Sequence, residues 1–242
     1  MRKKLYLSSL RVLMLGVLAM PIVSCDEETG TNEPDDELVE VGVIECADSN
    51  HAHAIDLGLS VKWACCNVGA ESPEDYGGYY AWGETEEKSD YTLDNYKYHN
   101  SNTGFFNIGS NISGTSYDVA HVKWGGSWRM PTWDEIKELF DKCSWKWIEI
   151  NGIKGQKVTG PNGNSIFLPA SGCSYDMEVD DSGWYGFYWS GTIDDIYCDC
   201  DHNHNRYYLH SCAFNFWFGY NITPQGTNPD RYLGYTVRPV TE

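Results

Sequence analysis

The chain has few basic residues: 17 Lys and Arg stand against 35 Asp and Glu, which gives a formal net charge of -18. Such an acidic surface repels phosphate backbones and anionic lipid headgroups, so we expect no nucleic-acid partner and no membrane binding through charge. The sequence also lacks a Gly-x-Ser-x-Gly nucleophile elbow, a His-Glu-x-x-His zinc helix and a glycine-rich phosphate loop. These absences favour a protein that is not an enzyme, with no catalytic residues and no organic cofactor.

Long apolar runs are scarce too, and the single one, residues 5–20, follows a basic N-terminus. It is too short for a permanent membrane span, and Ser24 and Cys25 follow it, a small residue before a cysteine. This pattern predicts a lipoprotein signal over residues 1–24, with lipid attached to Cys25 after cleavage. The alternative is an ordinary secretory signal, or an anchor helix that happens to contain a cysteine. In a lipoprotein, the lipid alone would hold the protein at the membrane.

The segment after Cys25 is acidic and contains Gly, Thr, Asn and Pro but few apolar residues. Low hydrophobicity and like-charge repulsion keep such a segment extended, so residues 25–45 are predicted to form a flexible tether. A disordered tail with no required reach would have the same composition. The remaining residues, 46–242, are rich in aromatic side chains and have the length of a single domain.

The apolar pattern of this domain predicts an α+β fold, with one helix among many short strands. Thr132 and Glu135 have the spacing of a capping box, and apolar residues recur after them at helical spacing. Alternation over residues 59–65 predicts a strand with its odd-numbered residues buried. Residues 85–118 have no lasting period and are predicted to form a long loop region. Further strands are expected at residues 77–82, 186–190, about 207–218 and 235–240, with a hairpin turning at residues 161–164.

Seven motifs occur in order from about residue 52 to the C-terminus. They are His53-Ala-Ile-Asp-Leu-Gly-Leu-Ser-Val-Lys-Trp63, Cys66-Asn-Val-Gly-Ala70, Tyr79-Tyr-Ala-Trp-Gly-Glu84, Asp118-Val-Ala-His-Val-Lys-Trp-Gly-Gly-Ser-Trp-Arg-Met-Pro-Thr132, Gly163-Asn-Ser-Ile-Phe-Leu-Pro169, Tyr188-Trp-Ser190 and Val237-Arg-Pro-Val240. With these motifs the chain resembles the Fibrobacter succinogenes major paralogous domain family. That family is abundant in Bacteroidetes lipoproteins and is similar in pattern to the C-type-lectin-like fold shared with formylglycine-generating enzymes.

The resemblance implies a C-type-lectin-like domain with one main helix, several short antiparallel strands and long loops. It also implies a lipid-anchored outer-membrane protein exposed at the cell surface, because the acidic residues after Cys25 are similar to the surface-export signal of those bacteria. No activity is established across the family. Formylglycine-generating enzymes bind copper through a pair of cysteines, and this chain does not have that pair at matching positions, so an enzyme of this type is disfavoured.

The chain has nine cysteines, which leaves an even number besides Cys25. In an oxidising compartment an even number is compatible with disulfides. Cys66 and Cys143 occupy positions where the family commonly carries cysteine. The resemblance therefore implies that these two residues are neighbours, either bonded or as two buried thiols.

Four weak metal-ligand candidates lie close together in the sequence: Cys198, Cys200, His202 and His204. On a straight strand they would share one face, but the first and last would lie roughly 20 Å apart, too far for one tetrahedral ion. Only a tight turn could bring them together. The spacing also lacks the usual Cys-x2-Cys pair, so an exposed loop is the simpler interpretation.

Calcium is the one cofactor left open, at Asp176, Glu178, Asp180 and Asp181. These residues depart from the EF-hand pattern, because Asp181 stands where glycine is needed and no glutamate closes the loop. Acidic loops of extracellular domains nevertheless bind calcium in other geometries.

Residues 191–223 have an unusual composition, rich in Asp, Asn, His, Tyr, Cys and Phe but without Lys, Glu, Gln or Met. These abundant residue types are ones encoded by codons ending in a pyrimidine, and Trp217 is the exception. Relatives of the lectin-like fold include targets of diversity-generating retroelements, which mutate such codons, so this stretch is a candidate diversified region. The alternative is a strand and loop whose composition simply suits the family.

The leading hypothesis is a non-catalytic surface module that binds an extracellular glycan or protein through C-terminal aromatic and Asn residues, because Tyr and Asn on loops are effective in recognition. If residues 215–220 form a strand, Asn215 and Trp217 face one side, and Phe218 and Tyr220 face the other. The alternative is a structural or adhesion subunit of a surface assembly, and an enzyme is the least favoured. The ligand candidates are Tyr208, Asn215, Trp217, Phe218, Tyr220 and Asn221.

Overall fold

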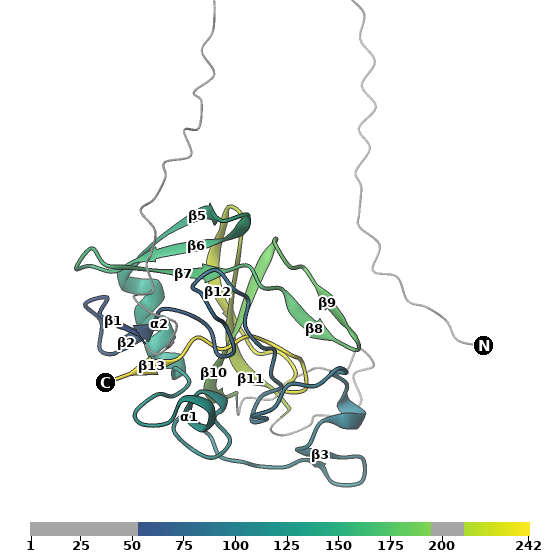
Figure 1. Cartoon of the computed structure of the whole chain (residues 1–242). Coiled ribbons are helices and arrows are strands. Elements are labelled where there is room, and N and C mark those ends of the chain that lie inside the picture. Colours follow the sequence, from purple (N-terminus) through teal and green to yellow (C-terminus); the bar gives the residue numbers. More distant parts are fainter. Residues whose placement is uncertain (1–52, 195–210) are drawn as a thin grey trace, which may run out of the picture. The chain divides into compact units, whose positions relative to one another are not determined.

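The computed structural model describes residues 53–194 and 211–242 (Figure 1). The helices in this part are η1 (Leu93–Asn95, a 3-10 turn), α1 (Val119–Trp124) and α2 (Trp133–Lys142). The strands are β1 (Ala54–Ile55), β2 (Lys62–Ala64), β3 (His99–Asn100), β4 (Gly104–Phe105), β5 (Ser144–Ile150), β6 (Ile153–Thr159), β7 (Ser165–Pro169), β8 (Cys173–Tyr175), β9 (Glu178–Asp180), β10 (Tyr185–Ile193), β11 (Ala213–Gly219), β12 (Ile222–Thr227) and β13 (Val240–Thr241). Among the described residues, no helix has the length and apolar character needed to cross a membrane.

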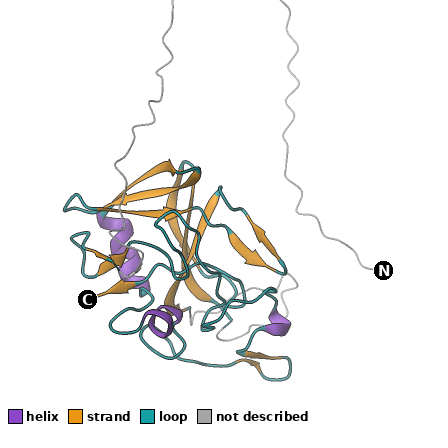
Figure 2. Ribbon diagram, viewed as in Figure 1, coloured by secondary structure: helices purple, strands orange, loops and turns teal. Residues whose placement is uncertain are grey.

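The strands form five small antiparallel sheets (Figure 2). Three sheets have three strands, in the orders β1-β2-β13, β5-β6-β7 and β10-β11-β12, and the other two are the hairpins β3-β4 and β8-β9. Strands therefore dominate over helices, in agreement with the predicted α+β class. Val240 of β13 pairs with Trp63 of β2, so the C-terminus returns to the first strands of the described chain.

The main helix begins where the capping box predicted, and this prediction is confirmed. The Thr132 hydroxyl accepts a hydrogen bond from the backbone N–H of Glu135 (3.3 Å), and the Glu135 carboxylate accepts one from the N–H of Thr132 (2.7 Å). Ile136 and Leu139 are fully buried on the face of α2 that contacts β10 and β11. The helix ends at Lys142, and Cys143 follows in extended conformation.

A second, shorter helix was not predicted. Asp118 caps α1, and its carboxylate accepts hydrogen bonds from the N–H groups of Ala120 (2.8 Å) and His121 (3.1 Å). It also accepts bonds from Gly114 and Met130, both at 2.8 Å. Burial raises the pKa of Asp118, and the four backbone donors partly offset that effect. One buried carboxylate thus connects the loop before α1 to the segment before α2.

The strand predicted over residues 59–65 is present but shorter, as β2. Val61, Trp63 and Cys65 are buried while Lys62 is exposed, which confirms the predicted inner face. The predicted hairpin is also confirmed, because β6 and β7 pair up to Thr159 and Ser165, on either side of the turn.

Other strand predictions were less accurate. Residues 77–82 form no strand, and only Tyr80 makes an isolated bridge, to Tyr235. Residues 186–190 lie within β10 as expected, whereas residues 235–240 make isolated bridges and join a strand only at β13. The strands β5 and β12 were not predicted. The long loop region is largely confirmed, with η1 and the small β3-β4 hairpin as its regular parts.

The core consists of two main aromatic-rich clusters on either side of the β10-β11 pair. Tyr188 belongs to the cluster that includes Trp63, Ile136 and Phe216, whereas the next residue, Trp189, belongs to the other cluster. Successive side chains of a strand point to opposite faces, so β10 and β11 separate the two clusters. Gly186 permits close packing here, because a Cβ atom at that position would lie 2.4 Å from the Phe218 ring.

The proposed pairing of Cys66 with Cys143 is not formed. Cys143 is half-buried with a free thiol and packs at the edge of the first cluster, while Cys66 is fully buried in a different, smaller cluster. The two residues therefore belong to separate parts of the core. Cys212, in contrast, is disulfide-bonded.

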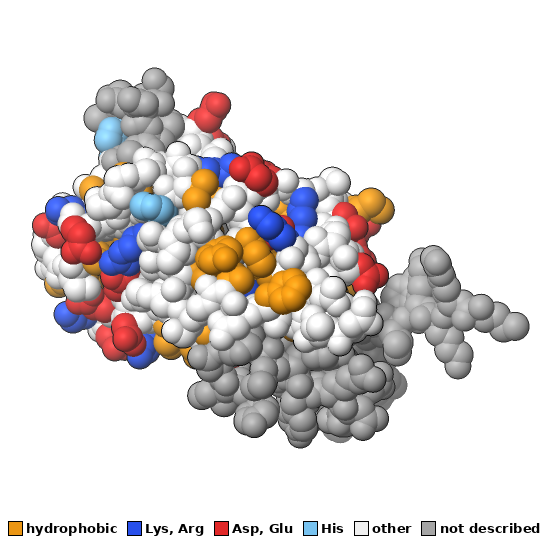
Figure 3. Space-filling view, turned by 90° about the horizontal axis from the view of Figure 1, so that it is seen from below, with side chains coloured by type: hydrophobic (Ala, Val, Ile, Leu, Met, Phe, Trp, Pro, Cys, Tyr) orange, Lys and Arg blue, Asp and Glu red, His pale blue; other side chains and the backbone are white. Residues whose placement is uncertain are grey.

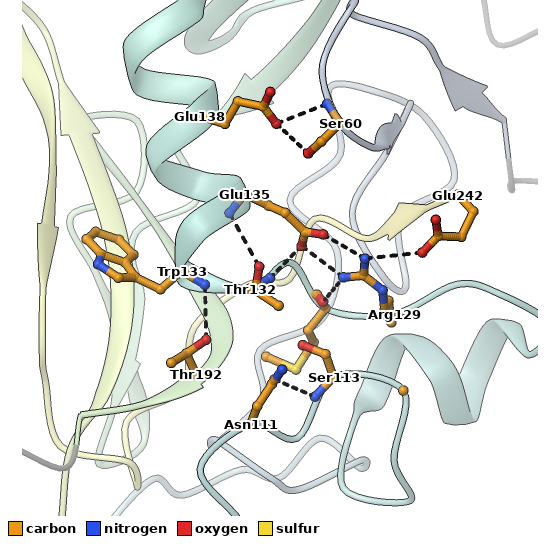
Figure 4. Close-up of polar contacts among 12 residues, drawn as sticks. Ser60, Asn111, Ser113, Arg129, Thr132, Trp133, Glu135, Glu138, Thr192 and Glu242 are labelled. Carbon is orange, nitrogen blue, oxygen red and sulfur yellow. Dashed lines mark hydrogen bonds and ion pairs between the residues drawn. The ribbon is translucent and has the colours of Figure 1, made fainter.

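A network of ionic and polar contacts surrounds the first turn of α2 (Figure 4). Both guanidinium NH2 groups of Arg129 donate to the Glu135 carboxylate, at 2.8 and 2.6 Å. Burial alone would raise the pKa of Glu135, but the bonds from Arg129 and Thr132 outweigh it and lower the pKa below the usual 4.5. Because the folded state holds the ionised form, Glu135 stabilises the fold above about pH 4.5, and this contribution is lost as the pH falls below that value.

We predict that Glu135→Gln lowers the free energy of unfolding by about 1–2 kcal/mol at pH 7, since it keeps the cap but removes a charged hydrogen-bonded pair. The difference from wild type should shrink as the pH falls below about 4.5. Urea unfolding at pH 7 and pH 3.5 measures both values. Asp134→Asn, on the same turn but with an exposed side chain, is the control and should have a much smaller effect. An E135Q deficit that persists undiminished at pH 3.5 would contradict this assignment.

Candidate functional site

Two of the predicted ligand residues are buried, and those two predictions are wrong. Asn215 and Phe218 are both 0% exposed, so neither can contact a ligand at the surface. The Phe218 ring packs 6.0 Å from that of Trp145, and the Asn215 amide oxygen accepts a bond from Thr227. They do face opposite sides of β11, as the alternation predicted. Tyr208 lies outside the described residues.

The remaining candidates lie nearer the surface. Trp217 is half-buried and stacks on Phe187, with ring centroids 6.3 Å apart. Tyr220 is 62% exposed and, with Asn221, forms the two-residue turn between β11 and β12. Asn221 adopts a left-handed conformation with φ of 54°, which asparagine tolerates better than most residues.

This turn borders a pocket of about 430 Å³. The pocket lies between the C-terminal end of α2, the strands β5 and β6, and the start of β12, and its volume is typical of small-molecule sites. We call it the tryptophan pocket. It is lined by Phe140, Cys143, Trp145, Trp147, Gln156, Asn221, Ile222, Thr223 and Pro224.

Strand pairing explains how the pocket wall is built. Trp145 and Trp147 alternate with Lys146 along β5, so the two indoles share a face. Gln156 of β6 pairs directly with Trp147, which makes it the diagonal neighbour of Trp145. The Trp147 ring meets Tyr220 edge to face at 6.1 Å, so Tyr220 extends the aromatic surface beyond the pocket.

The polar atoms of the wall are unusual. The Gln156 side-chain N–H group donates to the Gly219 carbonyl at 3.3 Å. Its oxygen, Oε1, and the indole nitrogen of Trp145 are buried, yet within the described part of the chain neither has a hydrogen-bond partner. Buried polar groups are normally paired. These two atoms have essentially no accessible surface, so they lie beneath the wall of the pocket and not at its surface.

Cys143 contributes the one nucleophilic atom of the lining. Burial, with a smaller contribution from the Glu138 carboxylate, raises the pKa of its thiol to about 11. The thiol is therefore protonated at neutral pH and weakly reactive, since the thiolate is the nucleophile. No residue of the described lining is charged. The pocket is suited to stacking and neutral hydrogen bonding.

The metal-ligand candidates do not form a site in the described residues. Cys198, Cys200, His202 and His204 lie outside that part. Asp176, Glu178, Asp180 and Asp181 belong to the exposed β8-β9 hairpin, where Tyr175 pairs with Glu178 across a tight turn. Within residues 53–194 and 211–242, no three His, Cys, Asp or Glu side chains gather in a metal-binding arrangement.

Other surfaces also expose apolar side chains. Figure 3 views the molecule from below Figure 1 and shows hydrophobic side chains gathered near the centre of that face. The β8-β9 hairpin exposes Tyr175, Met177 and Val179, at 46, 80 and 48%. The described part of residues 191–223 is, in contrast, largely buried in β10 and β11.

Trp145, Trp147 and Gln156 were not predicted as site residues from the sequence. The alternation of Trp145, Lys146 and Trp147 was the available signal for β5. No family model, curated protein or solved structure matches the chain, so the chemistry of the site rests on its own residues.

We predict that Cys143 reacts slowly with a maleimide at pH 7 and that its rate rises about tenfold per pH unit toward pH 11. Peptide mapping by mass spectrometry measures the rate at each cysteine. Cys173, whose thiol pKa is also raised to about 11 but which lies outside the pocket lining, is the internal reference and should behave alike. Complete labelling of Cys143 within seconds at pH 7 would contradict the raised pKa. Labelling of Cys143 at any pH in this series would show that its thiol is not in a disulfide.

Proposed function

We propose that the protein is a non-catalytic binding module, anchored by lipid at Cys25 to the outer membrane, that binds an extracellular glycan or protein in the tryptophan pocket. The observation that carries this proposal is a pocket with aromatic walls and uncharged polar side chains at Asn221 and Thr223. Ligand pockets of this kind are largely apolar, with a few polar groups that fix orientation.

The pocket also favours binding over catalysis. An enzyme of the usual kinds needs a general base, a nucleophile or a metal within reach of its substrate. In the described lining, Cys143 is the one candidate nucleophile, and its thiol is protonated at neutral pH. Its neighbours in the lining offer aromatic, amide, hydroxyl and aliphatic groups.

The C-type-lectin-like fold and the major paralogous domain family belong to the same proposal. The ordered motifs that carry the resemblance span nearly the whole described part of the chain. The small sheets, the main helix α2, the long loop region and the pairing of β13 with β2 are compatible with that fold. Surface display would place the pocket in the extracellular medium.

A second candidate is a subunit of a surface assembly. The β8-β9 hairpin favours it, because the hairpin exposes three large apolar residues and, among the described strands, β9 pairs with β8 alone. An exposed strand edge with apolar side chains is a site for pairing with another chain. If this function holds, sedimentation of the purified chain would show self-association that Met177→Lys abolishes.

Trp147→Ala tests the binding function. We predict that it weakens ligand binding about tenfold to a hundredfold, since it removes one aromatic wall of the pocket. Binding is measured on arrays of glycans and extracellular proteins, with and without calcium. Trp184→Ala is the matched control, because Trp184 is 66% exposed and does not line the pocket. Equal loss of binding in both variants, or unchanged binding in W147A, would place the ligand elsewhere.

Cys25→Ser tests the anchor. We predict that this variant incorporates no fatty acid and moves from the membrane to the soluble fraction. The reason is that the lipid on Cys25 provides all the membrane attachment of the proposed wild-type protein. Metabolic labelling with a fatty-acid analogue and cell fractionation measure the two effects. Cys46→Ser is the control and should keep both the label and the membrane location. A labelled, membrane-bound C25S protein would rule out this anchor.

A further inference from the structure

The strand β5 forms an open edge beside the tryptophan pocket. The order of its sheet is β5-β6-β7, so within the described residues β5 has a hydrogen-bonded neighbour on one side only. It is seven residues long and is the outermost strand of that sheet (Figure 1). The open edge of such a strand presents backbone N–H and C=O groups with which another extended chain can pair.

The register shows which backbone groups of β5 point outward. The carbonyl of Lys154 in β6 accepts a hydrogen bond from the N–H of Ala170 at 2.8 Å, so the backbone of Lys154 faces away from β5. Its partner across the ladder, Glu149, therefore faces away from β6, and alternation gives Trp147 and Trp145 the same orientation. In the described part of the chain, the backbone N–H and C=O groups of these three β5 residues form no hydrogen bond.

The side chains of Trp145 and Trp147 connect this open edge to the pocket, because both line it. In a strand added to β5, the residues opposite these two tryptophans would place their side chains on the same face of the sheet, toward the pocket. The strand β12 is the other edge strand that lines the pocket, but Pro224 in it lacks an N–H donor. The edge of β5 is therefore the better one for pairing.

The opposite face of the same edge is basic. Lys146 of β5 pairs directly with Lys157 of β6, and among the described residues neither side chain forms an ion pair. Like charges directly opposite each other destabilise a sheet. A carboxylate on an added strand, at the position beside Lys146, would relieve this repulsion. Because side chains alternate, that position neighbours one whose side chain faces the pocket.

From these features we propose that β5 binds an extended segment of a partner protein as an added strand. An apolar side chain of that segment occupies the tryptophan pocket, and an acidic side chain at a neighbouring position pairs with Lys146. The inference rests on the proposed binding function and chooses a protein over a glycan as the ligand. Backbone hydrogen bonds to β5 supply affinity, and the pocket and Lys146 supply specificity, which is the usual division in binding by strand addition.

A second copy of this chain, pairing through its own β5, is the main competing occupant. Glu149 is the one acidic residue of β5, and it shares a face with Trp145 and Trp147, not with Lys146. Pairing of two β5 strands would therefore leave the lysines without a carboxylate. Two molecules that each have a net charge of -18 also repel each other. Both observations favour a separate partner.

The test uses the full chain, purified in detergent, and capped peptides of the same length as β5. The peptides have the sequence Thr-Val-Glu-X-Glu-Val-Thr, where X is Leu, Phe, Tyr or Trp, and a matched set has Lys in place of Glu. Maleimide labelling of Cys143, which lines the pocket, reports occupancy, and Cys173 is the internal reference. We expect at least one acidic peptide to bind and to slow the labelling of Cys143 but not of Cys173.

Amide hydrogen exchange, measured by NMR, tests the pairing itself. Bound peptide should slow exchange at Trp145, Trp147 and Glu149, whose N–H groups point outward, and should have little effect at Lys146 and Ile148, which already bond to β6. Methylation of one alternate set of peptide nitrogens should abolish binding, whereas methylation of the other set should leave it unchanged.

The decisive variant is Glu149→Pro. It removes an outward N–H group while the bonds of β5 to β6 remain, so it should weaken peptide binding at least tenfold. Glu149→Ala is the matched control, because it removes the same carboxylate but keeps the N–H group, and it should bind normally. Thermal unfolding verifies that both variants fold. If E149P does not fold, the methylated peptides decide.

Lys146→Glu tests the charge. It should weaken binding of the acidic peptides about tenfold and strengthen binding of the Lys peptides. Lys62→Glu, the same substitution at an exposed position of β2 in another sheet, should change neither.

The other outcomes overturn the inference. Peptide binding that protects Cys143 without slowing exchange at Trp145 and Trp147 would leave the pocket as the binding site but reject strand addition. Self-association that the peptides dissolve would identify a second copy as the occupant. If no peptide binds at up to about 1 mM but arrays give a ligand sensitive to W147A, the inference fails and the proposed function stands. If the arrays also give no such ligand, both fail.

Discussion

The buried guanidinium of Arg238 imposes a constraint on much of the fold. It is 0% exposed, and three oxygens from separate segments accept its hydrogen bonds: Asn67 Oδ1 at 2.8 Å, the Ala64 carbonyl at 3.0 Å and the Phe167 carbonyl at 2.8 Å. Because an unpaired buried charge is very costly, these segments must meet around the arginine whenever the chain is folded. The constraint links β2, β7 and the C-terminal segment, and thereby fixes the sheet whose other strands, β5 and β6, carry the pocket.

The aromatic core then fixes the orientation of the pocket wall. The Trp145 ring lies 5.9 Å from Phe140, 6.5 Å from Phe216 and 6.0 Å from Phe218, so α2 and β11 both hold the indole in place. Gly219, at the end of β11, orients the Gln156 amide in the same way. Regular elements therefore hold this wall of the pocket in place, which is more precise than a site built on loops alone.

The sequence predictions were correct where a feature depends on residues close together in the chain, and they failed where it depends on packing between distant residues. The capping box of α2 and the β6-β7 turn are local, and both were predicted correctly. For β11, alternation gave the correct division of Asn215 from Phe218, but it could not reveal that both faces of that strand are covered by other elements. The pocket joins Trp145, Gln156 and Asn221, whose proximity depends on how two sheets pack, so composition and spacing could not identify it.

The chemistry of the pocket and the proposed lipid anchor complement each other physically. If the pocket binds a ligand as proposed, a few neutral hydrogen bonds and one aromatic surface would provide modest affinity, since each neutral hydrogen bond contributes about 1 kcal/mol net. Lipid attachment would concentrate many copies on one membrane, and a repetitive ligand such as a polysaccharide could then engage several pockets at once. Avidity of this kind exceeds single-site affinity by about 10² to 10⁴ without any new contact. A tether at residues 25–45 would give each pocket the reach that simultaneous binding requires.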